Sequence, residues 1–159
     1  KRVSLLQGLS VDTFDKIYHE LHLSKNAAQF INTLQKNQIE VGLVSGGFTP
    51  VVERLAKDLR ISLFAANQLE IRDDHLTGNL VGPIISREVK KETLVRWADE
   101  LEVPIDRTIA IGDGANDLAM LKRAGIGIGF CAKEIVKEEI PLQIEDRDLT
   151  KVLKLIDFL

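Results

Sequence analysis

The stretch Ile109–Asp117 constrains the fold of this chain more than any other part of the sequence. Its first half is a short apolar run, Ile109–Ile111, which is typical of a strand buried on both faces of a sheet. Glycines and carboxylates end the run, and helical spacing of apolar residues follows at Leu118, Leu121 and Ala124. A strand that turns through glycines into a helix places polar side chains at the carboxyl edge of a sheet, where open α/β folds bind ligands. The stretch therefore predicts both a fold class and the edge at which a site lies.

The polar half of this stretch suits a divalent cation. Asp113 and Asp117 stand four residues apart with Asn116 between them, and the glycines allow sharp turning. Oxygen ligands of this kind suit a hard cation such as Mg²⁺. The alternative is a polar turn in which Asn116 or Asp117 serves as the N-cap of the following helix. The sequence by itself leaves both interpretations open.

Composition bounds the class of protein. The chain has 159 residues, of which 45% are hydrophobic and 28% are charged, and this length suits one globular domain with a core. The net charge of −3 argues against a general nucleic-acid-binding surface. No apolar run in the sequence approaches the ~20 residues that a membrane crossing needs. The single cysteine, Cys131, excludes an intrachain disulfide, and with no signal peptide at the start it predicts a reducing, cytoplasmic setting.

Apolar spacing along the chain predicts alternating helices and strands. Helices are expected over residues 10–21 with Ser10 as cap, 24–34, 49–59 with Thr49 as N-cap, 90–101, 118–124 with Gly125 as C-cap, and 148–156. Strands are expected over residues 39–44, 61–64, 109–111 and 126–130, with a hairpin over 69–80 that turns at Asp73–Asp74. Strands that alternate with helices indicate a Rossmann-like α/β fold, in which a mostly parallel sheet carries helices on both faces.

Ser45, Gly46 and Gly47 end the strand expected over residues 39–44 and precede a helix. Glycine lets backbone N–H groups approach an anion, and the Ser45 hydroxyl adds another donor. These residues therefore predict a phosphate cradle. A tight strand-to-helix turn that needs glycine for its conformation explains the same residues equally well.

Lys90 lies on the apolar stripe of its helix. It stands four residues before Leu94 and seven before Trp97, near the start of the helix. Because lysine avoids burial unless it is paired, an inward lysine at this place predicts a partner for a bound phosphate. The alternative is a lysine whose stem packs against apolar side chains while its amine reaches water.

Three features now stand in order along the chain: Ser45–Gly47 after a strand, Lys90 at the start of a helix, and Gly112–Asp117 after another strand. In this order they resemble the haloacid dehalogenase-like phosphatases. The likeness runs through nearly the whole chain, and the surroundings of Arg2 and Phe48 extend it to the branch of that family that acts on phosphoserine. The segments that carry it are Arg2–Leu6, Val44–Phe48, Ala66–Asn67, Leu76–Gly78, Gly112–Asp117, Phe130–Lys133 and Arg147–Leu149.

The resemblance implies a Mg²⁺-dependent phosphomonoester hydrolase that works through an aspartyl-phosphate and converts phosphoserine to serine, a step of serine biosynthesis. In such an enzyme Mg²⁺ bridges the attacking aspartate and the phosphate, and Asp113 would be its ligand from this chain. Asp117 would hold the waters of the metal or orient Lys90. Lys90 would neutralise the charge that develops on the phosphoryl oxygens. These three residues are therefore the expected catalytic residues.

The resemblance also implies how the substrate is held. Ser45 and Gly46 would bind phosphoryl oxygens, and Asn116 would add a hydrogen bond near the site. Arg2 would clamp the carboxylate of the substrate, a task for which a planar guanidinium is suited. The implied partner is therefore a small phosphorylated substrate rather than a nucleic acid or a membrane.

The chain departs from the family in one respect. The family's first motif, an Asp-x-Asp at the end of an apolar strand, is expected upstream of Arg2, and no stretch of this chain matches it. Residues 1–23 are therefore expected to be the remnant of a helical cap, and residues 24–159 a core domain without its first strand. The chain alone is expected to be inactive for lack of the nucleophile, with the missing segment or a dimer partner to complete it. The alternative functions are a related phosphatase or phosphotransferase acting on another small phosphomonoester, and a non-catalytic phosphate-binding module.

Overall fold

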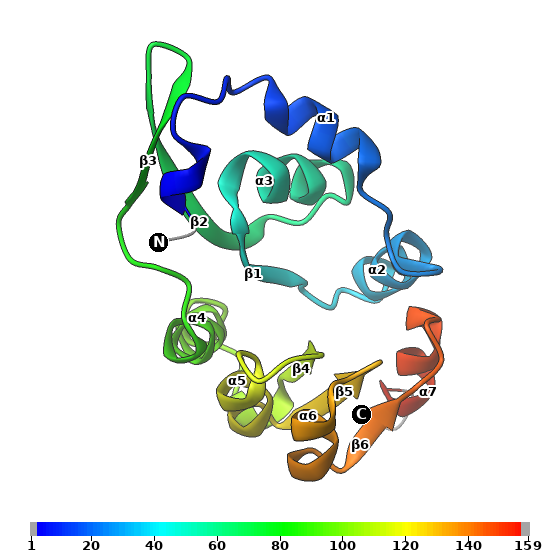
Figure 1. Ribbon diagram of the computed structural model, residues 1–159. Coiled ribbons are helices and arrows are strands. Elements are labelled where there is room, and N and C mark those ends of the chain that lie inside the picture. The colour runs from blue at the N-terminus through cyan, green and yellow to red at the C-terminus, as the bar shows by residue number, and fades with distance from the viewer. Residues whose placement is uncertain (1–2, 157–159) are drawn as a thin grey trace. The chain divides into compact units, whose positions relative to one another are not determined.

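The computed structural model describes residues 3–156, which divide into two compact units (Figure 1). The first unit comprises the described residues up to His22 together with Val41–Ile85. The second comprises Leu23–Glu40 and the described residues from Ser86 onward. Each unit contains a three-stranded sheet. No helix in this part of the chain combines the length and the apolar character that crossing a membrane requires.

The first unit is built on a sheet with the strand order β1-β2-β3. Strand β1 (Gly42–Phe48) runs parallel to β2 (Leu63–Arg72), and β2 runs antiparallel to β3 (His75–Val81). Asp73 and Asp74 make the turn of the hairpin with positive φ angles of 48° and 59°, as two-residue hairpin turns of this kind require. The helices of this unit are η1 (Val3–Leu6), α1 (Thr13–Glu20) and α3 (Thr49–Asp58), and α3 packs on β1 and β2 (Figure 1).

Apolar side chains from helix α1 and from the hairpin form the core of the first unit. Phe14 of α1, Leu69 of β2 and Leu76 of β3 are all buried. The Phe14 ring meets the ring of Phe48 edge to face, with centroids 6.5 Å apart, a geometry that the ring quadrupoles favour. Because Phe48 is the last residue of β1, this contact ties α1 to the carboxyl end of that strand.

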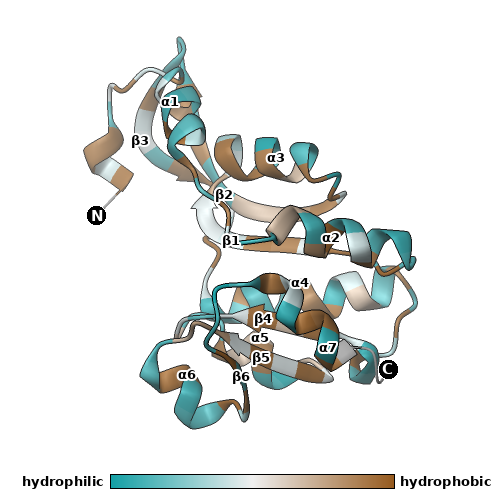
Figure 2. Cartoon of the chain, turned by 90° about the vertical axis from the view of Figure 1, so that its right-hand side faces the viewer, coloured by the Kyte–Doolittle hydropathy of each residue, from teal (hydrophilic) through white to brown (hydrophobic). Residues whose placement is uncertain are grey.

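The second unit is built on a wholly parallel sheet with the strand order β4-β5-β6. Its strands are β4 (Ile109–Gly112), β5 (Ile126–Phe130) and β6 (Leu142–Ile144). Its helices are α2 (Ala27–Lys36), α4 (Arg87–Glu100), η2 (Ile105–Arg107), α5 (Leu118–Arg123), α6 (Glu134–Glu139), η3 (Leu149–Val152) and α7 (Leu153–Ile156). Helix α5 packs on β4 and β5, and α4 packs on α5. Figure 2 shows polar and apolar residues alternating around α2, as expected for a helix with one buried face.

A glycine lets helix α5 lie very close to strand β5. A Cβ atom on Gly127 would come within 2.3 Å of the Leu121 carbonyl oxygen, so no larger residue fits there without a backbone shift. The side chains of Leu121 and Ile128 on either side of this contact are fully buried. The close packing fixes α5 on the sheet, and it thereby fixes the loop between β4 and α5 in which the predicted site residues lie.

The predicted α/β class is confirmed by the parallel pairing of β1 with β2, of β4 with β5 and of β5 with β6. For two of the predicted strands, the ends are wrong. The strand expected over residues 61–64 and the first arm of the hairpin form the single strand β2, because the intervening Asn67 pairs its side chain in hydrogen bonds and remains buried. Strand β1 begins at Gly42 rather than Ile39, because the Ile39 N–H donates to the Leu34 carbonyl at the end of α2.

Two predicted N-caps in the first unit are wrong, although the helix expected over residues 49–59 does begin at Thr49. Helix α1 begins at Thr13, because the Ser10 main chain pairs with His75 in a β-bridge and the Ser10 Oγ accepts from the Asp12 N–H at 3.3 Å. Thr49 does not cap α3, since its hydroxyl donates to the Asn67 carbonyl at 3.1 Å. The main-chain partner of Ser10 and the hydroxyl partner of Thr49 both lie far away in the sequence.

Helix boundaries in the second unit differ for local reasons. Helix α2 begins at Ala27, later than expected, because the residue before it has a left-handed conformation. Gly125 does not cap α5, which ends at Arg123 and leaves the helix through Ala124 in an extended conformation. The helix expected over residues 148–156 is the 3-10 turn η3 followed by α7, and α6 and β6 were not predicted.

A buried carboxylate, Asp148, joins the start of α2 to the start of η3. Its Oδ1 accepts hydrogen bonds from the Thr150 hydroxyl and, at 3.0 Å, from the Thr150 N–H, while its Oδ2 accepts from the Asn26 amide at 2.8 Å. The Thr150 hydroxyl and the Asn26 amide lower the pKa of Asp148 from 3.8 to about 2, and Lys25 contributes a weaker attraction. The ionised carboxylate is therefore the form that the fold stabilises.

Because the folded-state pKa of Asp148 lies below its ordinary value, its contribution to stability is present above about pH 4 and is lost as the pH falls toward about 2. We expect the Asp148→Asn variant to be less stable than the unsubstituted protein at neutral pH. We expect the difference in free energy of unfolding to shrink over that acidic range. Urea unfolding at a series of pH values measures this difference. A constant difference would show that the charge of Asp148 does not stabilise these contacts.

Candidate active site

A buried carboxylate organises the loop that follows β4. Asp117 is 4% exposed, and its Oδ2 accepts hydrogen bonds from the main-chain N–H groups of Asp113 at 3.1 Å and Gly114 at 3.2 Å. Gly112 permits this approach, because a Cβ atom there would lie 2.5 Å from the Cβ of Asp117. The loop is therefore wrapped around the Asp117 carboxylate, and the glycine at the end of β4 is required by packing.

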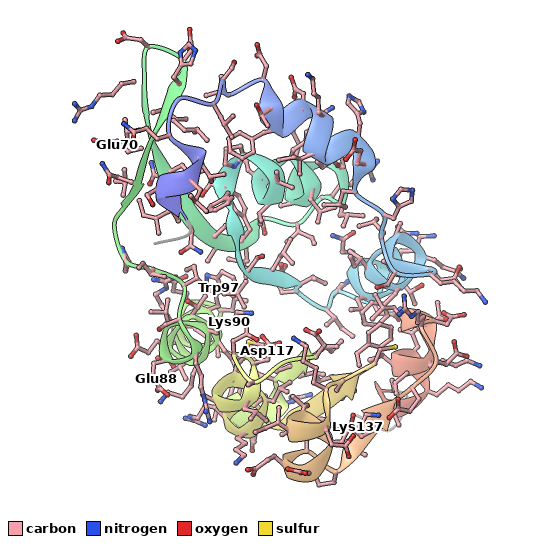
Figure 3. All side chains as sticks on the ribbon, viewed as in Figure 1. Glu70, Glu88, Lys90, Trp97, Asp117 and Lys137 are labelled. Atoms are coloured by element: carbon pink, nitrogen blue, oxygen red, sulfur yellow. The ribbon has the colours of Figure 1, made fainter. Side chains whose placement is uncertain are left out.

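The other oxygen of that carboxylate binds a buried lysine. Lys90 lies in the first turn of α4, whose start is capped by the Ser86 hydroxyl accepting from the Val89 N–H at 3.3 Å. The Lys90 Nζ lies 2.6 Å from Asp117 Oδ1, and the two side chains point toward one another (Figure 3). The Lys90 side chain is 8% exposed, so the alternative of an amine that reaches water is wrong. Burying two such charges costs several kcal/mol per ion before their attraction is counted, so this pair is poorly suited to stabilising the fold.

The Lys90 ammonium has hydrogen-bond donors to spare. It carries three N–H bonds, and among the described residues only the Asp117 carboxylate accepts one of them. Asp117 does not cap α5, because its carboxylate makes no hydrogen bond to the first turn of that helix. Its two oxygens serve the loop and the lysine instead. A fixed cation with free N–H groups is suited to binding an anionic oxygen.

Asp113 differs from Asp117 in having an exposed carboxylate. Its main-chain carbonyl accepts from the Lys133 N–H at 2.8 Å, while no described residue donates a hydrogen bond to its side chain. No group of three His, Cys, Asp or Glu side chains within residues 3–156 could hold a metal ion. One free carboxylate nevertheless fits Mg²⁺, which binds proteins through one or two carboxylates together with waters and substrate phosphates. Asp113 is therefore the candidate metal ligand from this chain.

The predicted cradle, Ser45–Gly47, lies in the first unit. Neither Gly46 nor Gly47 has a positive φ angle, so the alternative of a turn that needs glycine for its conformation is wrong. No described atom lies within 4 Å of the place that a Cβ on Gly46 would occupy, so the backbone there is bare and accessible. The Ser45 Oγ accepts from the Gly47 N–H at 3.0 Å, and its own hydrogen remains available to another acceptor. These features suit the binding of an anion.

The predicted site residues fall into three groups. The first group lies in the second unit. The loop after β4 carries Asp113, Asn116 and Asp117, and Asp117 joins this loop to Lys90 of α4. Asn116 is exposed. Ser45 and Gly46 lie in the first unit, and their convergence with that loop on one phosphate stays a prediction. Arg2 lies outside the described residues, and its role also stays a prediction.

One buried polar residue beside the cradle was not recognised from the sequence except as part of the family resemblance. Asn67 of β2 is 6% exposed, and its amide donates to the Gly46 carbonyl at 2.8 Å. The sequence carries a signal for it, because an amide side chain that follows Ala65 and Ala66 inside a strand must find partners when it is buried. The identity of those partners is not readable from the sequence.

A parallel sheet that carries a buried lysine–aspartate pair and a free carboxylate at its carboxyl edge defines an α/β protein suited to binding a phosphate-like anion. The family model described as haloacid dehalogenase-like hydrolase matches residues 2–122 of the chain. The chain therefore belongs to the haloacid dehalogenase-like hydrolases, and the resemblance found in its sequence is confirmed.

Relatives of this chain include phosphoserine phosphatases. The phosphoserine phosphatase of Streptococcus thermophilus is 46% identical over 157 residues, which make up 99% of this chain and 73% of that protein. A solved structure of a phospho-aspartyl intermediate analogue of phosphoserine phosphatase has a TM-score of 0.91 at 37% identity, over 98% of this chain and 74% of that one. A substrate-bound phosphoserine phosphatase complex has a TM-score of 0.92 with the same identity and coverage. Within the family, this chain is therefore similar to the phosphoserine phosphatases.

Removing the charge of Asp117 tests whether Lys90 and Asp117 form a buried ion pair. Asp117→Asn leaves the Lys90 ammonium buried without a countercharge, and we expect the free energy of unfolding to fall by about 3–5 kcal/mol. Urea unfolding measures the loss. Asp99→Asn, at an exposed position of α4, is the matched control and should change stability by less than about 0.5 kcal/mol. Equal stabilities of the two variants would contradict a buried pair.

Proposed function

We propose that this chain forms the greater part of an enzyme that hydrolyses O-phospho-L-serine to L-serine and inorganic phosphate. The observation that carries the proposal is the buried Lys90–Asp117 pair, in which the ammonium lies 2.6 Å from the carboxylate and keeps N–H groups for an anion. Relatives named phosphoserine phosphatase, among them a substrate-bound complex, support the choice of substrate. The family supports hydrolysis as the reaction.

The phosphoryl group is bound by donors from both loops in this proposal. The Ser45 hydroxyl and the bare backbone at Gly46 donate to phosphoryl oxygens, as the open geometry of that segment favours. Lys90 donates to the same group and neutralises the charge that builds up on its oxygens during transfer. Asn116 adds a hydrogen bond from the exposed side of its loop. Asp117 acts by orienting Lys90, because both of its oxygens already have partners within the protein.

Mg²⁺ is the cofactor that we propose, with Asp113 to hold it. When bound, the ion supplies positive charge that offsets the charge of the phosphate and orients it for attack. This chain contributes the exposed carboxylate of Asp113, and two hydrogen bonds hold the Asp113 main chain in place. The Asp113 N–H donates to Asp117, and the Asp113 carbonyl accepts from the Lys133 N–H. Asp113 is therefore held in place without using its own side chain.

The nucleophile in this proposal is an aspartate upstream of Lys1. Its carboxylate oxygen attacks phosphorus, the bond between phosphorus and the serine oxygen breaks, and a second aspartate two residues later protonates the leaving oxygen. That second aspartate then takes a proton from water, which attacks the aspartyl-phosphate and releases the carboxylate and inorganic phosphate. The phospho-aspartyl analogue among the structural relatives supports this route. An encoded Asp-x-Asp after an apolar strand upstream of Lys1 would agree with the enzyme, and its absence would favour a non-catalytic phosphate-binding module.

The wider setting follows from the same proposal. Residues 1–23 form the end of a helical cap and residues 24–159 the core domain. The reaction takes place in the cytoplasm and supplies serine, in keeping with the single cysteine of the chain and with the names of its relatives. The partner is a small phosphorylated substrate.

Substrate identity is tested at Arg2. In the complete protein we expect Arg2→Ala to raise KM for phosphoserine roughly 10- to 100-fold, because a charged hydrogen bond to the substrate carboxylate is lost. KM for phosphoethanolamine, which lacks only that carboxylate, should change little. Steady-state kinetics with both substrates make the comparison. Equal increases would favour the second candidate function, hydrolysis of another small phosphomonoester.

Metal dependence is tested at Asp113. Asp113→Asn replaces a carboxylate by a weak neutral ligand, and we expect Mg²⁺-dependent turnover of phosphoserine by the complete protein to be lost. The melting temperature should be retained, because no described residue bonds to this side chain. The exposed Asp99→Asn variant serves again as the control and should keep full turnover. Retained turnover in Asp113→Asn would show that the metal ligand lies elsewhere.

A further inference from the structure

Asn67 is a buried polar side chain that the proposed mechanism does not use. Its Nδ2 donates to the Gly46 carbonyl at 2.8 Å, and its Oδ1 accepts from the Ile85 N–H at 2.8 Å. Both partners are main-chain groups of fixed polarity, so the orientation of the amide is determined. Its main-chain carbonyl also accepts from the Thr49 hydroxyl. Asn67 therefore contacts the cradle at Gly46 and the first residue of the helix that follows it.

The contact with Gly46 lies where the pairing of β1 with β2 is interrupted. Val44 pairs with Ala65 and Phe48 pairs with Asn67, so the register shifts between these two points. Ser45–Gly47 fills the interruption, and this departure from regular pairing makes its backbone available to a ligand. Main-chain polar groups that such an interruption leaves out of the ladder need other partners. The Asn67 amide supplies a donor to the Gly46 carbonyl within the interruption.

The peptide plane between Gly46 and Gly47 carries the effect of Asn67 to Ser45. A trans peptide is planar, with its C=O and N–H pointing in opposite directions, and no cis peptide is found in the described chain. Because Asn67 holds the Gly46 carbonyl, it also sets the direction of the Gly47 N–H, which donates to Ser45 Oγ at 3.0 Å. Ser45 Oγ accepts this bond, and its own hydrogen is then left to donate to another acceptor.

We propose that Asn67 is a positioning residue for phosphate binding, which acts through the Gly46–Gly47 peptide on the Ser45 hydroxyl. The inference rests on the proposed function in one respect, that Ser45 donates to a phosphoryl oxygen. It adds to that function a residue that touches no substrate. It also gives a reason why a strand of the first unit contains a buried amide.

A double-mutant cycle tests the route through Ser45. The complete protein is prepared unsubstituted and as Asn67→Ala, Ser45→Ala and the double variant, and the Kd for inorganic phosphate is measured by calorimetry in the presence of Mg²⁺. We expect each single variant to weaken binding roughly tenfold or more, as for a lost hydrogen bond to a charged group. The double variant should bind no more weakly than Ser45→Ala, because Asn67 acts only through that hydroxyl. Losses that multiply would overturn the proposal.

A second variant guards against misfolding and against a purely structural effect. Asn67→Asp keeps the size of the side chain and the acceptor for the Ile85 N–H, but its ionised carboxylate cannot donate to Gly46. We expect it to fold but to melt at a lower temperature, because it buries a charge with an incomplete set of partners, to weaken phosphate binding at least tenfold, and to speed hydrogen exchange at the Gly47 amide. Gln68→Glu, at the exposed neighbouring position, controls for the added charge and should bind phosphate normally. Unchanged phosphate binding and unchanged Gly47 exchange in Asn67→Asp would overturn the proposal.

The outcomes separate this inference from the proposed function. An unsubstituted protein that does not bind phosphate would contradict the proposed function, and the inference with it. The inference alone would be contradicted if the unsubstituted protein binds phosphate and hydrolyses phosphoserine, but the losses of phosphate affinity in Asn67→Ala and Ser45→Ala multiply in the double variant. Non-multiplying losses together with faster Gly47 exchange would support both.

Discussion

The bond between the Lys90 ammonium and the Asp117 carboxylate is the interaction on which the site depends. Both side chains are buried, and their charged atoms lie 2.6 Å apart. A buried charge is tolerated only when its partners are complete, and Asp117 meets this condition by accepting also from the N–H groups of Asp113 and Gly114. The lysine is therefore fixed before any ligand arrives. A preorganised cation of this kind is what stabilises charge that develops on a transferred group.

The two loops that carry the predicted ligands share one physical design. Each lies at or beyond the carboxyl end of a strand with a parallel neighbour, and each is held by one buried polar side chain. Asp117 holds its loop as an acceptor of backbone N–H groups, whereas Asn67 holds the cradle as a donor to a carbonyl. The glycines differ in purpose. Gly112 is required because a side chain would strike Asp117, while Gly46 has open space around it and leaves backbone free for a ligand.

Local features of the sequence were sufficient for much of the fold and for part of the site. The apolar run and glycines of Ile109–Asp117 predicted a strand, a turn and a helix, since each depends on neighbouring residues. Helical spacing predicted that Lys90 faces inward, and it is buried. In the first unit the predicted caps failed where a residue bonds to a distant segment, as the Thr49 hydroxyl does to the Asn67 carbonyl and as the Ser10 main chain does in its bridge to β3.

The family, the candidate ligands and most of the order of strands and helices were predicted from the sequence alone, because they follow from residue type, spacing and motif. Helix α6 and strand β6 are the exceptions. The tertiary structure decided which of two tasks each ambiguous residue performs. Asp117 binds a lysine rather than capping a helix, and Gly46 provides open backbone rather than a left-handed turn. The physical reason is that such a task is set by the partner, and the partner of Asp117 lies 27 residues away in the chain. Only folding brings the two together.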